Sequence, residues 1–325
     1  MSIYIYPTYN PVRDKSGNLY IKYFHDAFKD QGYVISNNIG RAGIISIFAN
    51  LSSSIFIINW VDLIPNKRFG KIQFVVFVVG LCLLKMLNKD VVWVLHNKRA
   101  HKGKSMLVSC GMSLMAKLST VVITHSLEGV SFFDLTYPKY SGKCHYIPHP
   151  VYTNLIYPFK KEKWDYIIWG GINERKKVAD FLEFISNREF YESKKILICG
   201  RCNDSEYTKR IESACSANIV FENRFLSDEE LKERISQSRC VLFTYSPDSV
   251  LSSGALIYTL NFCKPIIGPR VGSFEDLTDI VSCYNTFEDI EKIPLKENMH
   301  ACSSYISSNT WLDFPNKVMS LIKNT

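Results

Sequence analysis

Short apolar segments alternate with stretches of helical periodicity along the whole of this 325-residue chain, and this alternation constrains the fold more than any other feature. Short runs rich in β-branched and aromatic residues are typical of buried strands, and the amphipathic stretches between them are typical of helices. A regular succession of strand and helix predicts parallel sheets that helices cover on both faces. The chain is therefore expected to be an α/β protein with doubly wound parallel sheets.

The predicted strands form two series, separated by a proline-containing linker over residues 148–163. The first series is expected at residues 3–6, 33–36, 54–60, 91–95, 120–124 and 145–147. The second series is expected at residues 166–169, 195–199, 219–222, 240–244, 265–267 and 279–282. This indicates one domain over residues 1–152 and another over residues 153–308, facing a central cleft. Residues 309–325 are expected to form a helix that packs back on the first domain.

Composition excludes disordered and fibrous classes, because an apolar fraction of 46% is ample for two buried cores. The N-terminus, MSIYIYPTYNP, lacks the basic start and long apolar core of a secretory signal. A cytoplasmic protein with reduced cysteines is therefore expected. Cys199 and Cys202 form a C-x-x-C, but no second pair follows at ligand spacing, which argues against a metal site.

The uncharged segment 74–84, FVVFVVGLCLL, is too short to cross a bilayer, which requires about 20 apolar residues. It is predicted to be a helix buried between strands. The alternative is a helix that lies in a membrane interface, assisted by Lys67, Arg68, Lys71 and Lys85. This alternative leaves open a peripheral position on the inner face of the plasma membrane.

A basic cluster follows the strand predicted at residues 91–95. The residues of this cluster that are candidates for ligand binding are Asn97, Lys98, Arg99, His101 and Lys102. Open α/β sheets bind ligands beyond the carboxyl ends of their strands, so cations at this position favour an anionic substrate or an acidic membrane surface. A solvated surface is the plainer alternative. Nucleic acid is not an expected partner, because no aromatic-basic pattern or helix-turn-helix spacing accompanies the cluster.

Residues 241–272, VLFTYSPDSVLSSGALIYTLNFCKPIIGPRVG, have the layout of a phosphate-binding turn. A strand leads through a polar turn to Ser252, Ser253 and Gly254 at an expected helix start. Such a start leaves backbone amides unpaired and carries partial positive charge, which suits a diphosphate. An ordinary capped helix is the alternative. Two better-known nucleotide motifs are missing: Lys98 replaces the first glycine of a P-loop, and no G-x-G-x-x-G follows the first strand.

The two-domain layout, the mid-chain linker, the WGGINERKK sequence at residues 169–177 and the Ser-Ser-Gly to Lys-Pro block together resemble GT-B-fold sugar-nucleotide glycosyltransferases. The most similar branch is the bacterial one that builds capsule, exopolysaccharide and lipopolysaccharide. The resemblance implies two Rossmann-like domains and the transfer of a sugar from a GDP- or UDP-linked donor. It implies a glycan or polyprenyl-linked acceptor. It also implies, weakly, that the donor is GDP-mannose.

The resemblance also implies a set of donor-binding residues. Gly170 and Gly171 correspond to the turn beside the donor, and Arg175 and Lys176 to cations that stabilise the charge growing on the leaving diphosphate. The other positions are Gly200, Arg201, Phe225, Tyr245, Ser252, Ser253 and Gly254. An exposed helical turn is the alternative for residues 175–177, and a core position is the alternative for Phe225.

One departure from the resemblance bears on stereochemistry. Retaining members carry a Glu-x7-Glu pattern, and the corresponding positions here are Val250 and Tyr258. This resembles the beta-mannosyltransferase-like branch and favours inversion, which requires a general base. His96, at the end of an apolar strand, is the first candidate, and Asp14 and Glu128 are others. His96 could instead bind the donor phosphate or the acceptor, or be structural.

No Asp-x-Asp, the usual carboxylate clamp for a divalent ion on a sugar nucleotide, occurs in the sequence. The reaction is therefore expected to be metal-independent, with no cofactor besides the nucleotide sugar as co-substrate. Two other functions remain open: a sugar-nucleotide epimerase of similar fold, which a product assay would distinguish, and a non-enzymatic two-lobed ligand-binding protein.

Overall fold

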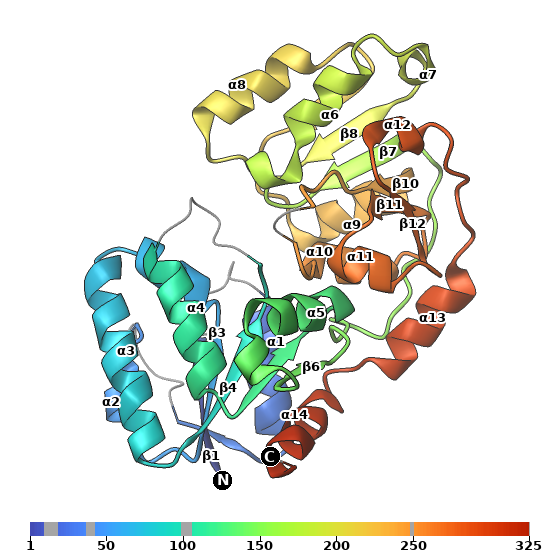
Figure 1. The fold of residues 1–325 in the computed structure, drawn as a ribbon. Coiled ribbons are helices and arrows are strands. Elements are labelled where there is room, and N and C mark those ends of the chain that lie inside the picture. The colour runs from blue at the N-terminus through green and yellow to red at the C-terminus, as the bar shows by residue number, and fades with distance from the viewer. Residues whose placement is uncertain (10–18, 37–42, 99–105, 248–249, 325) are drawn as a thin grey trace. The chain divides into compact units, whose positions relative to one another are not determined.

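The computed structural model describes residues 1–9, 19–36, 43–98, 106–247 and 250–324. The chain divides into two compact units (Figure 1): unit 1 comprises Met1–Tyr152 and Asn309–Thr325, and unit 2 comprises Thr153–Ser308. Within the described residues, each unit contains one six-stranded sheet whose neighbouring strands all run parallel. The expected pair of Rossmann-like α/β domains is confirmed.

The sheet of unit 1 has the strand order β2-β1-β3-β4-β5-β6. Its strands are β1 (Ser2–Tyr6), β2 (Val34–Ile35), β3 (Ile55–Asn59), β4 (Asp90–Leu95), β5 (Val121–Thr124) and β6 (Cys144–Tyr146). Every residue of β3 and β5 is buried, as parallel strands covered on both faces should be. All six strands match predicted segments, with ends that differ by at most two residues.

Helices surround this sheet. They are α1 (Leu19–Asp30), α2 (Ser46–Ala49), α3 (Gly70–Met86), α4 (Met106–Leu118), α5 (Leu127–Thr136) and α14 (Phe314–Lys323), with the 3-10 helices η1 (Val61–Asn66) and η2 (Pro138–Tyr140). Helix α14 belongs to unit 1 although it follows unit 2 in the chain. Its Phe314 ring lies 5.1 Å from that of Phe24 on α1, and Trp311 lies between 5 and 6 Å from both. The C-terminal segment therefore completes the core of unit 1.

Helix α3 differs from the expectation of a fully buried helix. Phe74, Phe77, Leu81 and Leu84 are buried. The opposite side is exposed and is nevertheless apolar, with Ile72, Val75, Val79 and Met86 in solvent. Because the whole segment is apolar, its sequence has no amphipathic period that would reveal which side faces water. Among the described residues, no helix combines the length and apolar character that crossing a bilayer requires.

The sheet of unit 2 has the strand order β12-β11-β10-β7-β8-β9. Its strands are β7 (Trp164–Trp169), β8 (Ile196–Cys199), β9 (Ile219–Glu222), β10 (Ser238–Leu242), β11 (Ile266–Pro269) and β12 (Val281–Tyr284). The helices are η3 (Glu174–Lys176), α6 (Val178–Ile185), α7 (Glu189–Glu192), α8 (Ser205–Ala214), α9 (Asp228–Ser236), α10 (Gly254–Leu260), α11 (Gly272–Asp276), α12 (Phe287–Ile290) and α13 (Met299–Ser308). These six strands were also predicted.

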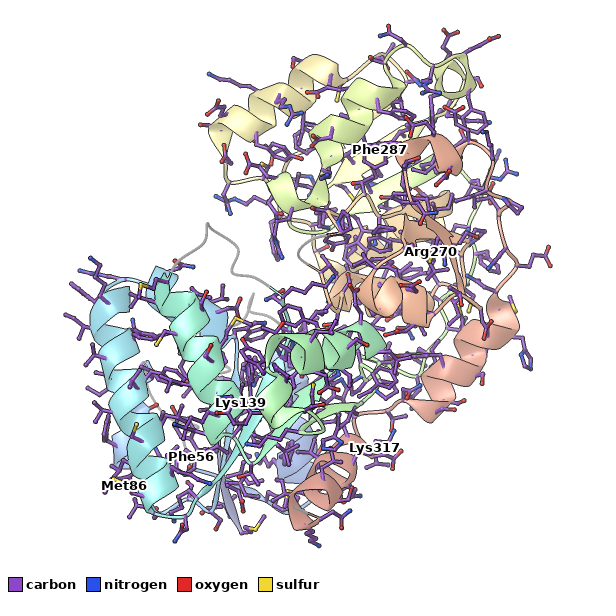
Figure 2. All side chains as sticks on the ribbon, in the orientation of Figure 1. Phe56, Met86, Lys139, Arg270, Phe287 and Lys317 are labelled. Atoms are coloured by element: carbon purple, nitrogen blue, oxygen red, sulfur yellow. The ribbon has the colours of Figure 1, made fainter. Side chains whose placement is uncertain are left out.

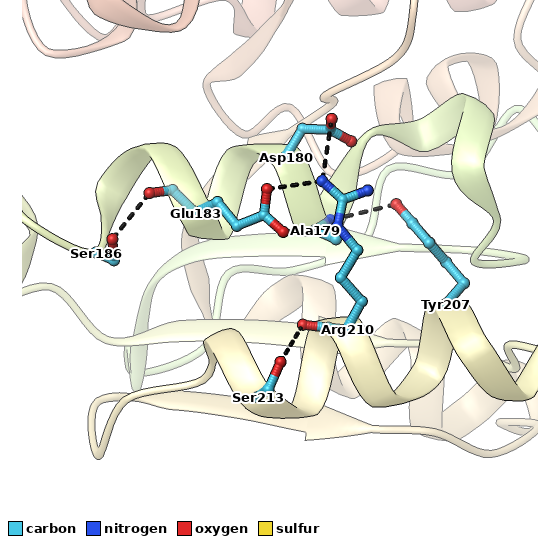
Figure 3. Close-up of polar contacts among 7 residues, drawn as sticks. All are labelled: Ala179, Asp180, Glu183, Ser186, Tyr207, Arg210 and Ser213. Carbon is cyan, nitrogen blue, oxygen red and sulfur yellow. Dashed lines mark hydrogen bonds and ion pairs between the residues drawn. The ribbon is translucent and has the colours of Figure 1, made fainter.

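Helices α6 and α8 of unit 2 are joined by both apolar and charged contacts. Phe181 of α6 is fully buried in the core beneath them. At the surface, Arg210 of α8 donates to both carboxylate oxygens of Glu183 at 2.6 Å and lies 3.4 Å from Asp180 (Figure 3). Because Arg210 and Glu183 are both more than 40% exposed, solvent screens this pair and its net contribution is small.

The core contact and the ion pair predict very different losses of stability. Phe181→Ala should lower the free energy of unfolding by ~3–5 kcal/mol, because it leaves a cavity in the core. Arg210→Ala should lower it by less than about 1 kcal/mol, because the arginine is exposed. Urea unfolding followed by circular dichroism measures both. Equal losses in the two variants would contradict the conclusion that the core contact of Phe181 stabilises the unit more than the ion pair of Arg210 does.

Candidate functional site

The carboxyl end of β7 brings together the largest group of predicted donor-binding residues. Beyond Gly170 and Gly171 the chain forms η3, which carries Lys176. The Lys176 side chain is only 6% exposed. Its Nζ donates to the carbonyl oxygen of Trp169 at 2.5 Å and lies 5.1 Å from the centre of the Tyr245 ring. Lys176 and Tyr245, which are 69 positions apart in the sequence, thus form one cationic group.

No carboxylate neutralises this ammonium within the part of the chain that the structure describes. One carbonyl and one aromatic face stabilise it, but a buried charge without a counter-ion is costly unless an anion completes its environment. A buried lysine at the carboxyl edge of a parallel sheet is therefore suited to an anionic ligand.

Backbone contacts hold Lys176 in this position. The hydroxyl of Thr244, which follows β10, donates to the carbonyl oxygen of Lys176. The amide of Ser246 donates to the carbonyl oxygen of Arg175 at 2.8 Å. Lys177 then adopts the left-handed conformation, with φ of 48°, and α6 begins at Val178. The turn is therefore fastened to the end of the neighbouring strand, and the alternative of an exposed helical turn is wrong for Lys176.

At two positions, Gly170 and Gly200, the packing of neighbouring atoms explains why the residue is glycine. Gly170 has φ of +102°, and a Cβ there would stand 2.8 Å from Nζ of Lys176. Gly200, at the end of β8, has φ of +133°, and a Cβ there would stand 2.0 Å from the carbonyl oxygen of Gly170. A side chain at either position would displace the lysine or the loop. By contrast, a Cβ on Gly171 would have no atom of the described residues within 4 Å.

Ser253 connects the start of α10 to the same group. Its Oγ lies 3.4 Å from the Tyr245 hydroxyl and accepts from the amide of Leu256 at 3.2 Å, as an N-cap does. Its own amide donates to Oγ of Ser273 at 3.3 Å. The expectation that this amide would be unpaired is therefore wrong, while Gly254 begins the helix and Ser252 precedes it half-buried.

The remaining predicted donor residues lie on loops after other strands. Arg201 follows β8 and is exposed, and Phe225 follows β9 with 67% of its surface in solvent. Phe225 is thus not a core residue. Arg175 is half-buried beside Lys176. In the described residues, no hydrogen bond joins Arg201 or Phe225 to the side chains of Lys176 and Tyr245.

The carboxyl edge of the other sheet, in unit 1, carries His96. This residue follows β4 directly and is 9% exposed. Its ring stacks on Trp60 at a centroid distance of 4.9 Å, and the edge of Tyr20 approaches it at 5.0 Å. His96 therefore lies in an aromatic enclosure rather than on an open surface.

The hydrogen bonds of Asn59 determine the tautomer of His96. Asn59 Nδ2 lies 3.0 Å from the carbonyl oxygen of Tyr6, which can only accept, so the amide group must point there. Asn59 Oδ1 then lies 3.0 Å from Nε2 of His96. An oxygen without a proton requires Nε2 to be the protonated nitrogen. The lone pair of His96 is consequently on Nδ1.

His125, which follows β5, has the opposite tautomer. Its Nδ1 lies 2.8 Å from the carbonyl oxygen of Ile147, so Nδ1 carries the proton. Its Nε2 lies 2.8 Å from the hydroxyl of Tyr20 and accepts from it. Both ring nitrogens of His125 are engaged in hydrogen bonds, so this histidine is structural.

Three neighbouring histidines in unit 1 are held in the neutral form. Burial, together with the proximity of His125 and His149, lowers the pKa of His96 well below its ordinary value of 6.5. Burial lowers the pKa of His125 to about 4. Burial and then His125 lower the pKa of His149 to about 3, against the effect of its bond to the Pro150 carbonyl. The cluster thus binds protons only in acid.

The other predicted residues at this edge that the structure describes, Asn97, Lys98 and Glu128, each have a polar partner. Asn97 donates to the buried Asp62 of η1 at 3.2 Å. Lys98 forms an ion pair with Glu128 of α5, so this candidate base is bound to a cation. Asp14, Arg99, His101 and Lys102 lie outside the described residues.

Sequence reasoning missed Asn59 and Trp60. Asn59 ends a strand of apolar residues and is fully buried. A single polar residue at the end of such a run is the sequence signal that could identify it. Trp60 has φ of 48°, a left-handed conformation that is rare for a large side chain. Such strain is often concentrated at functional sites.

No protein-family model and no curated relative matches this sequence, but several solved structures share its fold. HepE from Anabaena, solved with UDP and glucose, aligns with a TM-score of 0.69 and 10% identity over 100% of both chains. The lipopolysaccharide outer core galactosyltransferase WaaB aligns with a TM-score of 0.62 and 11% identity, over 98% of this chain and 99% of WaaB.

TarM aligns with a TM-score of 0.59 and 11% identity, and this chain spans 54% of the length of TarM. At such low identity the likeness concerns the fold alone. The chain thus has the two-domain GT-B fold that is found in glycosyltransferases such as WaaB.

The neutral histidines predict a loss of stability in acid. The unfolded chain takes up these protons near pH 6.5, whereas the folded cluster resists them to about pH 4 or lower. Stability should therefore be complete above about pH 6.5 and fall between pH 6.5 and about pH 4. His125→Gln should reduce that fall by about 3 kcal/mol. The control is His300→Gln, because His300 is exposed. Urea unfolding between pH 6.5 and about pH 4 measures the free energy of unfolding of both variants. An equally steep fall of that free energy in His125→Gln and His300→Gln would refute the prediction.

Proposed function

We propose that this chain is a glycosyltransferase that moves a sugar from a nucleoside-diphosphate donor to a hydroxyl of a glycan acceptor. The observation that carries the proposal is the buried Lys176 ammonium, which has no carboxylate partner in the described residues and stands at the carboxyl edge of a GT-B domain. The diphosphate of a nucleotide sugar would supply the anion that this ammonium lacks.

Donor binding is assigned to unit 2. Lys176 receives the diphosphate, and the open space beside Gly171 leaves room for the ligand to approach the backbone. Phe225, being exposed beyond β9, is available to contact the base. The likeness to HepE, which binds UDP and UDP-glucose, favours a UDP-linked donor over the GDP-linked one that the sequence resemblance suggested.

The reaction that we propose is a single displacement. The acceptor oxygen forms a bond to the anomeric carbon while the bond from that carbon to the diphosphate oxygen breaks. The leaving diphosphate keeps the electron pair, and the fixed ammonium of Lys176 stabilises the growing negative charge. With this cation in place, and with no Asp-x-Asp in the sequence, the transfer is proposed to need no divalent metal.

Proton removal is assigned to His96 in unit 1. The bond to Asn59 leaves Nδ1 with the lone pair, and the lowered pKa keeps it unprotonated at neutral pH. A low pKa also makes the imidazole a modest base, so orientation is its main contribution. A base that takes the acceptor proton directly agrees with inversion, as does the lack of an acidic pair at Val250 and Tyr258.

The acceptor is proposed to be a lipid-linked glycan of bacterial surface polysaccharide synthesis, used at the inner face of the plasma membrane by a cytoplasmic enzyme. The fold shared with WaaB supports this choice. The basic residues beginning at Lys98 are proposed to bind the anionic part of that acceptor. Release of a glycan product, and not interconversion of donors, distinguishes this function from an epimerase.

Donor binding predicts a selective effect of Lys176. In isothermal titration with UDP, GDP, dTDP and their sugar conjugates, at least one compound should bind the native chain. Lys176→Met should weaken that binding by tenfold or more, because a charge-assisted contact worth ~1.5–3 kcal/mol is lost. The neighbouring Lys177→Met, at a half-buried position, should leave it unchanged.

Chelator should affect neither binding nor transfer in these experiments. Failure of every compound to bind, or equal effects of the two lysine variants, would exclude the proposed donor site. Loss of activity in chelator with recovery in magnesium or manganese would exclude the metal-independent scheme alone.

The tautomer of His96 can be observed directly. In long-range proton–nitrogen NMR spectra, His96 should carry its proton on Nε2, whereas His125 should carry its proton on Nδ1 and serves as an internal control. Asn59→Leu should abolish the preference in His96 and lower kcat by ~10²-fold or more without changing donor affinity. A protonated Nδ1 in native His96, or an unchanged kcat in Asn59→Leu, would rule out the proposed role.

A further inference from the structure

The exposed side of α3 is a continuous apolar face. Ile72, Val75, Val79, Cys82 and Met86, called here the α3 face, are all exposed. Their spacing of three and four residues places them along one side of the helix. Figure 2 shows Met86 at the outer, C-terminal end of α3. The neighbouring Phe69, with 66% of its surface in solvent, extends the face beyond the first turn.

The core of unit 1 leaves this face uncovered because α3 uses its other side for packing. Phe74, Phe77, Leu81 and Leu84 are buried, and α4 lies alongside α3 in Figure 1. Helix α2 touches α3 through Ile47 and Gly80. Ile45, which precedes α2, and Phe48 of α2 are also exposed. Contiguous exposed apolar surface of this kind marks an interaction site.

The charged side chains of residues 67–89, which include all of α3, are cationic. Arg68 and Lys71 are exposed at its N-terminal end, and Lys85 is exposed at its C-terminal end. Residues 67–89 contain no Asp or Glu. Asp62, the nearest acid before this segment, is buried and accepts from Asn97. Asp90, the nearest acid after it, is half-buried at the start of β4 and accepts from the hydroxyl of Thr120. The partner of this face should therefore be apolar at its centre and anionic at its rim.

A second copy of this chain does not meet that description. In a symmetric helix pair, Lys71 and Lys85 of one copy would face the same cations of the other, and like charges repel. A bilayer with anionic headgroups does meet it. Apolar side chains enter the boundary between headgroups and acyl chains, while lysine stems extend so that their charges reach the phosphates.

We propose that the α3 face docks on an anionic lipid surface, with α3 lying in the plane of the interface. A helix of 17 residues is about 25 Å long, too short and too well packed on one side to insert across the membrane. The inference rests on the proposed function for the membrane surface at which the lipid-linked acceptor is used, and it names the part of unit 1 that would contact that surface. Its evidence is the exposed residues of α3 and not the transfer chemistry.

The experiment is cosedimentation of the whole chain with phosphatidylcholine vesicles, with and without phosphatidylglycerol. The native chain should bind only the vesicles that contain phosphatidylglycerol, and added salt should weaken the binding. Val75→Glu with Val79→Glu should reduce the partition coefficient by more than tenfold. Lys71→Glu with Lys85→Glu should reduce it by more than tenfold too, because each lysine contributes about fivefold near an anionic surface.

Matched controls come from the same unit. Leu135→Glu changes a leucine of α5 that is 84% exposed, and Lys139→Glu changes an exposed lysine of η2. Neither control should alter vesicle binding by more than about twofold. A change of that size is the nonspecific effect of adding negative charge elsewhere on the unit. Unchanged thermal midpoints show that each variant is folded.

Three results would overturn the proposal. The first is that the native chain binds no anionic vesicle. The second is that the Val75→Glu/Val79→Glu variant binds vesicles as well as the Leu135→Glu control does. The third is that light scattering shows the native chain to be a dimer and this double variant to be a monomer. The last would assign the α3 face to a second copy. Nucleotide titration without vesicles tests the donor site separately, so failure of docking and failure of the proposed transfer are distinguishable.

Discussion

Parallel strand pairing is the constraint on which both units depend. A parallel pair needs a crossover, so every strand leaves its sheet at the same edge and a helix returns the chain to the other. This geometry gathers residues that are far apart in the sequence. In unit 1 it places Asn59 and His96, at the ends of β3 and β4, in contact with each other. In unit 2 it brings the loop after β7, with Lys176, against the end of β10 at Thr244.

The same constraint explains how much of the fold the sequence predicts. Each strand is buried on both faces, so it appears as an apolar run between polar turns, and all twelve strands in the described residues coincide with predicted segments. Helix α3 shows the limit of this reasoning. Residues 74–84 are apolar on all sides, so burial of Phe77 and exposure of Val75 and Val79 follow only from how α2 and α4 pack.

The candidate site is less predictable because its properties depend on tertiary contacts. The basic triplet from Arg175 to Lys177 has the composition of an exposed turn, yet the bond from Thr244 and the absence of a Cβ at Gly170 bury one of its three side chains. Asn59 is a single amide in an apolar strand. Its importance is visible only once the carbonyl of Tyr6 and the ring of His96 lie on either side of it.

The surroundings of His96 in unit 1 disfavour a positive charge, whereas the surroundings of Lys176 in unit 2 stabilise one. Around His96 there are rings and neighbouring neutral imidazoles, so a proton taken up there lacks a counter-ion and the pKa falls. Around Lys176 there are a carbonyl oxygen and the face of Tyr245, which stabilise a cation without neutralising it. A neutral imidazole is suited to receive a proton, and an ammonium is suited to an anion that gains charge as a bond breaks. The displacement that we propose, of a diphosphate by a hydroxyl, would need one group of each kind.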